Sequence, residues 1–273
     1  AIFGLTLLPV DREEGSLRCT VLSVGHGLSV IVETPSGKTL VYDVGSRAGG
    51  EFPSRVLKEA LWARGISKVD ALIVSHSDID HYNGVLDLLE SVPVGRIFCS
   101  RHFPDSRQPL TLQMFERVEE LGIGSTIVSQ GDSLSLDNAV MMRILQPVSA
   151  TSYGSDNAAS VVLELEYQKR RILLTGDLDE DGLVELLKQP ARKVDLLLAP
   201  HHGEPGANPH ELAAWASPTF VVASAPTPAY QRALESNYGP ETRVIMTSES
   251  GAVTATVASK GVLNVEPFLD GAK

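Results

Sequence analysis

The sequence has few cysteines, a deficit of positive charge and no long apolar run. Its two cysteines, Cys19 and Cys99, form no C-x-x-C pair, and each lies in a strand-like apolar stretch. We therefore expect free thiols that pack as small apolar side chains, and the redox compartment stays open. No segment approaches the roughly 18 apolar residues that a membrane-spanning helix needs, so no span is expected.

The first ten residues, AIFGLTLLPV, are apolar but too short for a span. They also lack the basic leader and the cleavage site of a signal peptide. Two interpretations of this run stay open. It could begin a domain that follows a membrane segment, or it could form a buried edge strand.

The formal net charge is −11, from 23 Lys and Arg against 34 Asp and Glu. A basic nucleic-acid groove is therefore not expected, because phosphate binding is normally carried by clustered Lys and Arg. Divalent cations offer another route, since two of them would add about four positive charges at the place where a phosphodiester docks. An acidic chain of this kind can still act on a polyanion.

Hydrophobic periodicity predicts strands and helices in two successive groups. The first group has strands at 17–24, 29–34 and 39–43, a helix from Arg55 with Ser54 as its N-cap, and further alternating elements up to residue 146. The second group begins with a hairpin at 160–177 and ends with a hairpin at 252–266. Two such groups predict two sheets packed face to face with helices outside, a four-layer αββα fold of the α/β (α+β) class.

No repeat, linker or low-complexity segment interrupts the chain. We therefore expect a single domain over residues 1–273, with its core at about 17–257.

The sharpest motif is SHSDIDH at residues 75–81, directly after an apolar strand. It places four metal-ligand side chains in six residues: His76, Asp78, Asp80 and His81. Residues two apart on an extended chain project to the same side, so His76 and Asp78 can hold one ion while a turn presents Asp80 and His81 to another. The ordinary alternative is a polar loop whose aspartates cap the helix near Gly84, but a cap needs only one Asp.

Two further strands end in potential ligands. Residues 174–177 read LTGD, where Asp177 could bridge two cations, and residues 200–203 read PHHG, where either His201 or His202 could be a ligand. Alone, a Gly-Asp pair is usually a turn and a histidine pair is usually structural. Three strand ends that carry such residues together indicate a two-metal hydrolase.

These motifs resemble those of the metallo-β-lactamase superfamily, whose first motif is usually H-x-H-x-D-H; Asp78 stands at its second His. Within that superfamily, residues 17–257 resemble the C-terminal domain of the ComEC DNA-uptake channel family. The segments that carry this resemblance are VLSVGHGLSVIVETPSGKTLVYDVG, DALIVSHSDIDHYNGV, NAASVVLEL, RILLTGDLDEDG and DLLLAPHHG.

The resemblance implies the metallo-β-lactamase fold and a metal-dependent nuclease that degrades the non-transported strand of incoming DNA during natural transformation. It implies a soluble domain on the extracytoplasmic side of a bacterial inner-membrane protein, excised from that larger protein. Its implied partners are DNA, as single strand or duplex end, and the membrane channel portion of the same polypeptide.

Carried over residue by residue, the resemblance assigns His76 and Asp78 to one cation. It assigns Asp80, His81 and His202 to the other, with Asp177 shared. Asp43 would orient the first loop. The remaining ligand position falls at Asn157, beside Asp156.

Asp80 and His201 are the expected catalytic residues. Asp80 is expected to be needed for both a cation and hydrolysis, and His201 could protonate the leaving oxygen or hydrogen-bond the phosphate. Because Asp78 replaces a histidine, the site is richer in oxygen, which favours Mn²⁺ or Mg²⁺, while Zn²⁺ stays open.

The chain departs from the family pattern at three other places. The glycine-rich start resembles G-Q-G-D in the family but reads GHGL at 25–28, the Ser common after P-H-H-G is Glu204, and the segment at 238–240 lacks the His of Y-G-H-P. The family's phosphate or substrate contacts are therefore not carried over to these positions.

Two other functions stay open at this point. The same fold hosts many chemistries, so a small-molecule hydrolase of the thioester or lactam kind is one alternative. The other is a non-catalytic domain that binds DNA or a partner through a degenerate site, which Asn157, Glu204 and the acidic balance favour.

Overall fold

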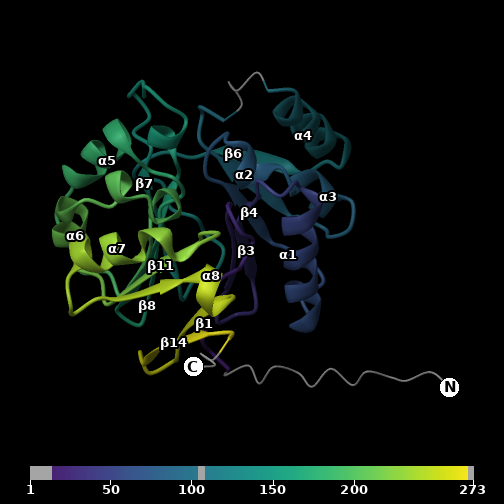
Figure 1. Ribbon diagram of the computed structural model, residues 1–273. Coiled ribbons are helices and arrows are strands. Elements are labelled where there is room, and N and C mark those ends of the chain that lie inside the picture. Colours follow the sequence, from purple (N-terminus) through teal and green to yellow (C-terminus); the bar gives the residue numbers. More distant parts are fainter. Residues whose placement is uncertain (1–13, 104–107, 270–273) are drawn as a thin grey trace.

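The computed structural model describes residues 14–103 and 108–269, and in these residues two β-sheets pack face to face between two layers of helices (Figure 1). The predicted four-layer αββα arrangement is confirmed. The apolar run at residues 1–10 lies outside the described residues. None of the described helices is long and apolar enough to cross a membrane.

Within the described part of the chain, the first sheet has eight strands in the order β14-β13-β1-β2-β3-β4-β5-β6. Strands β3 to β6 run parallel, and the strands on the other side of β3 pair antiparallel. The strand bounds are β1 (Leu17–Val21), β2 (Ser29–Glu33), β3 (Thr39–Val44), β4 (Ala71–Val74), β5 (Arg96–Cys99), β6 (Gly124–Ile127), β13 (Val253–Val257) and β14 (Leu263–Pro267). The helices of this half are α1 (Glu51–Ala63), α2 (Ile79–Tyr82), α3 (Val85–Leu89) and α4 (Pro109–Glu120).

The second sheet contains six strands among the described residues, in the order β12-β11-β10-β9-β8-β7. Strands β9 to β12 run parallel, and β7, β8 and β9 pair antiparallel. The bounds are β7 (Met141–Gln146), β8 (Val162–Tyr167), β9 (Arg170–Leu174), β10 (Leu196–Leu198), β11 (Phe220–Ala223) and β12 (Arg243–Met246). The helices are α5 (Glu180–Leu187), α6 (His210–Ala216), α7 (Gln231–Tyr238) and α8 (Thr247–Ser250), with short 3₁₀ turns η1 (Asn157–Ala159), η2 (His201–Gly203), η3 (Pro205–Ala207) and η4 (Pro228–Tyr230).

Alternating side chains divide the apolar residues among three cores. In β9, Ile172 and Leu174 enter the core between the two sheets, whereas Leu173 faces the core under α5, α6 and α7. In β2, Val30 and Val32 enter the central core and the residue between them packs under α1, α3 and α4. Because successive residues of a strand point to opposite faces, a sheet covered on both sides needs apolar residues at nearly every position.

Helix α1 begins earlier than the sequence indicates. It starts at Glu51, so Ser54 lies buried inside the helix and the predicted N-cap at Ser54 is wrong; Gly50 occupies the N-cap position. Pro53 is accommodated because the first turn of a helix has no intrahelical partner for its N–H groups. Gly50 is required by packing, since an added Cβ would lie 2.1 Å from the carbonyl oxygen of Asn83.

The two cysteines lie in different cores. Cys19 packs between the sheets, and Cys99 packs between the first sheet and its helices. Both thiols are buried and free, as expected.

The polar motifs follow the carboxyl ends of β3, β4, β9 and β10. Parallel strands end at the same edge of a sheet, so these motifs lie close together. The segment after β1 reaches this edge as well. Its Leu28 N–H lies 3.1 Å from the Gly45 carbonyl oxygen and 3.3 Å from the Asp80 carbonyl oxygen. Three distant segments thus meet backbone to backbone beside Asp80.

Glycine makes this approach possible. A Cβ on Gly45 would lie 2.2 Å from the Asp80 carbonyl carbon and 2.3 Å from the His81 nitrogen, and a Cβ on Gly27 would lie 2.3 Å from the Gly45 carbonyl oxygen. Gly27 also has a φ of 151°, which disfavours other residues.

We expect Gly45→Ala to lower the free energy of unfolding by about 1–3 kcal/mol, because the new methyl group must push the Asp80 backbone away. Gly124→Ala is the matched control, since its Cβ would come no nearer than 3.7 Å to a neighbour, a side-chain atom of Arg96. Thermal and denaturant unfolding measure both variants. Equal stabilities would show that the backbone contact at Gly45 is not tight.

Candidate metal centre

One group of potential ligands consists of His76, His81 and Asp177, all buried. The two histidines come from the loop after β4 and from α2, and the carboxylate follows β9 in the other sheet. The Nε2 atom of His81 lies 3.0 Å from Oδ1 of Asp177, and the two imidazole centroids are 4.2 Å apart. Both sheets therefore contribute to this group.

A second group consists of His26, Asp80 and His202. Nε2 of His202 lies 3.6 Å from Oδ2 of Asp80 and 3.3 Å from Oδ2 of Asp177. Asp177 thus turns one oxygen toward His81 of the first group and the other toward His202 of the second. A carboxylate in this position can be shared by two cations.

Hydrogen bonds from the far side fix the orientation of the imidazoles. Nδ1 of His81 lies 2.8 Å from Oδ2 of the buried Asp43, and Ser75 donates to Asp43 through both its N–H and its hydroxyl. Because the Ser75 hydroxyl donates to Asp43, it accepts from Nδ1 of His76, at 2.9 Å. Each Nδ1 therefore carries a proton, and each Nε2 faces the centre.

His202 is oriented in the same way from the second sheet. Its Nδ1 donates to the carbonyl oxygen of Ser224 at 2.9 Å. The Ser224 hydroxyl donates in turn to the carbonyl oxygen of Gly27 at 2.7 Å. One serine thus links the loop after β10 to the segment after β1.

The Nε2 atoms at the centre fit a divalent cation. Among the described residues, Nε2 of His26, His76, His81 and His202 is buried without a hydrogen-bond partner. A buried polar atom without a partner costs about 1–3 kcal/mol, and a cation would supply the missing partner for each lone pair. Two imidazoles and one carboxylate per group match the donors that divalent transition-metal ions use in proteins.

The charges of the centre reinforce this fit. Burial raises the pKa of Asp177, but the facing His202 and His81 outweigh it and hold that pKa well below its usual range. Burial lowers the pKa of His202, but Asp177 and Asp80 outweigh it and raise the pKa to about 9. The carboxylates thus stabilise protonated imidazoles, and the same negative charge favours binding of a metal cation.

Asp78 stands at the mouth of the centre. Its side chain is 44% exposed, and its Oδ2 lies 3.8 Å from Nε2 of His76. It belongs to neither of the two ligand groups found among the described residues. The observed grouping also differs from the expected one, which placed His81 with Asp80 and His202. His81 lies instead with His76 and Asp177, because Asp43 binds its Nδ1 from the opposite side of the ring.

Asn157 begins η1 beside the centre, and its amide donates to Oδ2 of Asp179 at 3.2 Å. The neighbouring Asp156 accepts from the Ser77 hydroxyl at 2.5 Å. The side-chain amide of Asn157 is therefore bonded to Asp179.

His201 lies at the rim between two carboxylates. Its Nδ1 is 3.5 Å from Oδ2 of Asp179, and its Nε2 is 3.9 Å from Oδ2 of Asp177. The hydrogen bond with Asp179 raises the pKa of His201 above its usual value, against the opposing effect of burial. The side chain is 30% exposed, so this imidazole can meet both solvent and the centre.

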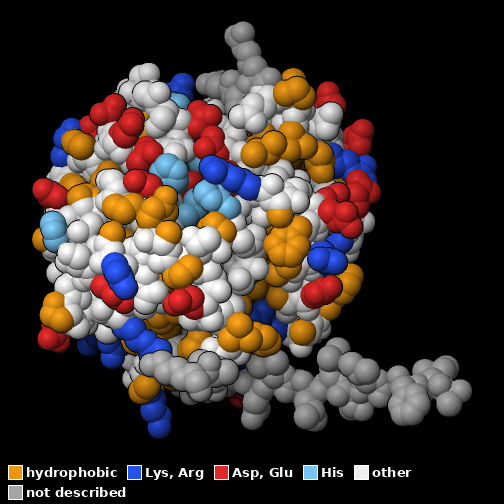
Figure 2. Space-filling model, in the orientation of Figure 1, with side chains coloured by type: hydrophobic (Ala, Val, Ile, Leu, Met, Phe, Trp, Pro, Cys, Tyr) orange, Lys and Arg blue, Asp and Glu red, His pale blue; other side chains and the backbone are white. Residues whose placement is uncertain are grey.

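The sequence motifs do not identify three residues that lie at the centre: His26, Arg47 and Asp179. Asp179 lies two residues after Asp177, a spacing that could have suggested it. Arg47 donates from Nε to Oδ2 of Asp80 at 3.1 Å, with its side chain 61% exposed. Figure 2 shows histidine side chains at the surface between the two halves, with acidic side chains and a basic side chain beside them.

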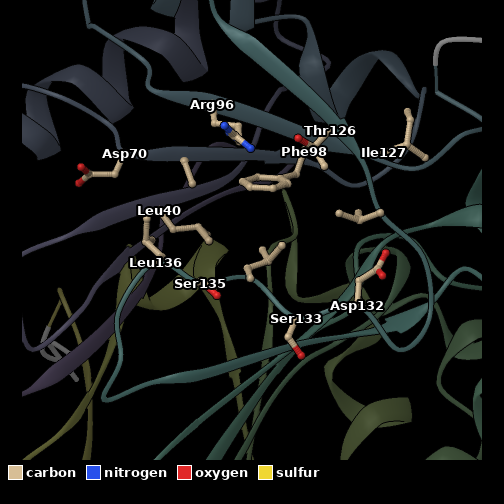
Figure 3. Close-up of a pocket in the computed structure, with 13 residues that line it drawn as sticks. Leu40, Asp70, Arg96, Phe98, Thr126, Ile127, Asp132, Ser133, Ser135 and Leu136 are labelled. Carbon is tan, nitrogen blue, oxygen red and sulfur yellow. The ribbon is translucent and has the colours of Figure 1, made fainter.

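A separate cavity of about 620 Å³ opens at the other end of the parallel strands. Figure 3 shows Arg96 and Phe98 of β5 on one side of it and Ser133 and Ser135 on the other. Its Asp70 is already bound to Lys38 and Lys68, at 3.3 and 2.9 Å. The cavity includes none of the metal-ligand candidates, so the chemistry lies at the opposite edge.

Comparison with known proteins gives one matching family model, the metallo-beta-lactamase superfamily, over residues 22–208. ComE operon protein 3 of Bacillus subtilis (strain 168) is 27% identical over 98% of this chain and 36% of its own length. Competence protein ComA of Neisseria gonorrhoeae is 25% identical over 93% of this chain and 34% of its own length. The chain therefore spans about a third of these relatives.

Among solved structures, a mutant of CmlA β-hydroxylase from Streptomyces venezuelae is similar in fold, with a TM-score of 0.55 and 15% identity. The match covers 86% of this chain and 53% of that protein. At this identity, the likeness concerns the fold alone.

We expect cation binding to release protons. At pH 7 the cation-free protein holds a proton on His202, because its pKa is raised to about 9, and the pKa of His81 is also raised. A cation must displace these protons, so apparent affinity should rise as the pH increases from about 7 toward 9. Calorimetry of Mn²⁺ or Zn²⁺ binding in buffers of different ionisation enthalpy measures the release, and a buffer-independent enthalpy would contradict the expectation.

Asp43→Asn should weaken cation binding about 10–100-fold, as expected for a partner that orients a ligand histidine, because an amide cannot accept all the hydrogen bonds that Asp43 accepts. Asp70→Asn is the matched control. Asp70 is a partly buried carboxylate that also accepts a backbone N–H, but it lies at the other end of β4. Direct titration with Zn²⁺ compares the two, and equal losses would rule out a specific role for Asp43.

Proposed function

This chain belongs to the metallo-beta-lactamase superfamily, and from that premise we propose that it is a metal-dependent phosphodiesterase that hydrolyses DNA. The relatives named ComE operon protein 3 and competence protein ComA support a task connected with competence. In the proposal, the domain degrades the non-transported strand during DNA uptake.

The observation that carries the proposal is the pair of ligand groups joined by Asp177. Divalent cations bound at such a pair lower the pKa of water and polarise the oxygens of a phosphate. They also answer the objection that the chain is acidic, since the positive charge would sit where a polyanion docks. We expect two cations per chain, Mn²⁺ or Zn²⁺, with Mg²⁺ as a further candidate.

The chain's own residues have separate tasks in this proposal. Asp177 faces both groups and keeps them together, and Asp80 serves the second group. His201, held by Asp179 at the rim, is positioned to give a proton to the leaving oxygen. Arg47, beside Asp80 and mostly exposed, offers a guanidinium that can bind a phosphate oxygen.

The proposal extends to the larger protein. Because the chain spans about a third of its curated relatives, we propose that it is one domain of a longer membrane protein. The channel portion of the same polypeptide would be its partner, and the domain would lie on the extracytoplasmic side of the inner membrane, where incoming DNA is met.

The test is an assay with end-labelled single- and double-stranded DNA in Mn²⁺, Zn²⁺, Mg²⁺ or EDTA. We expect cleavage that needs a divalent cation and that falls at least about 100-fold in Asp80→Ala, since removing a second-shell partner alone costs about 10–100-fold. Asp87→Ala, an exposed carboxylate on α3, is the control and should keep full activity. His201→Asn should keep its cations but lose turnover.

Other results would replace the proposal. Hydrolysis of thioester or lactam substrates with intact DNA would indicate a small-molecule hydrolase of the same fold. A chain that binds DNA but retains no cation after purification and reloading would indicate a degenerate binding domain.

A further inference from the structure

His26 lies in the GHGL segment between β1 and β2, far in the sequence from the strand-end motifs. Two contacts fix this segment at the centre. The His26 carbonyl oxygen accepts from the N–H of Arg47 at 2.8 Å, and the next carbonyl, of Gly27, accepts from the Ser224 hydroxyl at 2.7 Å. Since Ser224 also holds Nδ1 of His202, the backbone of His26 is tied to a residue of the metal centre.

The imidazole of His26 is directed at the second ligand group. Its Nε2 lies 3.4 Å from Oδ2 of Asp80, and its ring centroid lies 4.6 Å from that of His202. One ligand atom from each of these three residues lies within 4.8 Å of the other two. Nε2 of His26 is buried and has no hydrogen-bond partner among the described residues.

An ordinary ion pair with Asp80 does not explain this geometry. Asp80 already accepts a hydrogen bond from Arg47. A buried ring nitrogen that faces a carboxylate and a second imidazole lacks a partner that a cation would provide.

We infer that His26 is a ligand of the second cation, and that with Asp80 and His202 it forms a site for a transition-metal ion rather than Mg²⁺. Two imidazole nitrogens and one carboxylate oxygen suit Zn²⁺, Mn²⁺, Fe²⁺ or Co²⁺, whereas Mg²⁺ prefers oxygen ligands and retained waters. The inference rests on the proposed metal centre.

Metal binding by the full chain tests this ligand without any activity measurement. Cation-free protein is titrated with Co²⁺ and Zn²⁺, the bound metal is counted after gel filtration, and the visible absorption of bound Co²⁺ reports its ligands. We expect two ions in the unsubstituted chain, and in His26→Ala a second ion bound at least about 10-fold more weakly, with a changed Co²⁺ spectrum. His210→Ala removes an exposed imidazole on α6 and should change neither.

Two more variants keep the test decisive. His26→Gln preserves a neutral polar side chain of similar size, so it separates loss of a nitrogen ligand from a folding defect, which thermal unfolding checks. His26→Asp exchanges nitrogen for oxygen and should increase the ability of Mg²⁺ to compete with Co²⁺ at the second site.

The outcomes separate this inference from the proposed function. If His26→Ala and His26→Gln bind two ions with unchanged affinity and spectrum, His26 is not a ligand, while a two-cation nuclease remains possible through the other residues. If the unsubstituted chain binds no cation under any condition, both the ligand role of His26 and the proposed function are overturned.

Discussion

The contact between Asp177 and His81 joins the ends of the two sheets, and the centre depends on it. Asp177 follows β9 of one sheet, and His81 lies in α2 beyond β4 of the other. Their atoms can meet only if the two sheets pack in one register over the central apolar core. Packing of that core is therefore a condition for the chemistry at its edge.

Such a cluster is unfavourable by itself, because burying carboxylates and imidazoles removes them from water. The fold offsets this cost with orienting partners that lie behind the ligands: Asp43 and Ser75 for one half, Ser224 for the other. The glycine backbone contacts at Gly27 and Gly45 add a rigid frame. Rigidity of this kind keeps the ring nitrogens directed at a small volume even before a cation binds.

Much of this arrangement can be predicted from the sequence. Short apolar runs bounded by turn residues indicate the two sheets, and Asp177 and His202 follow strand ends, where parallel strands meet at one edge. His26 could not be predicted, because its position depends on the backbone approach of GHGL to Gly45, a contact between distant segments that no local pattern encodes. The start of α1 differs from the prediction for a related reason, since packing against Asn83 requires Gly50 at this position, whereas capping preference favours Ser54.

The two buried cysteines have a practical consequence. Burial raises the pKa of both thiols to about 12, so neither Cys19 nor Cys99 is ionised at neutral pH. Because they lie on opposite faces of one sheet, they react with alkylating reagents only when the layers separate. Alkylation of Cys19 therefore reports how often the core between the sheets opens, and alkylation of Cys99 reports how often the core under the helices opens.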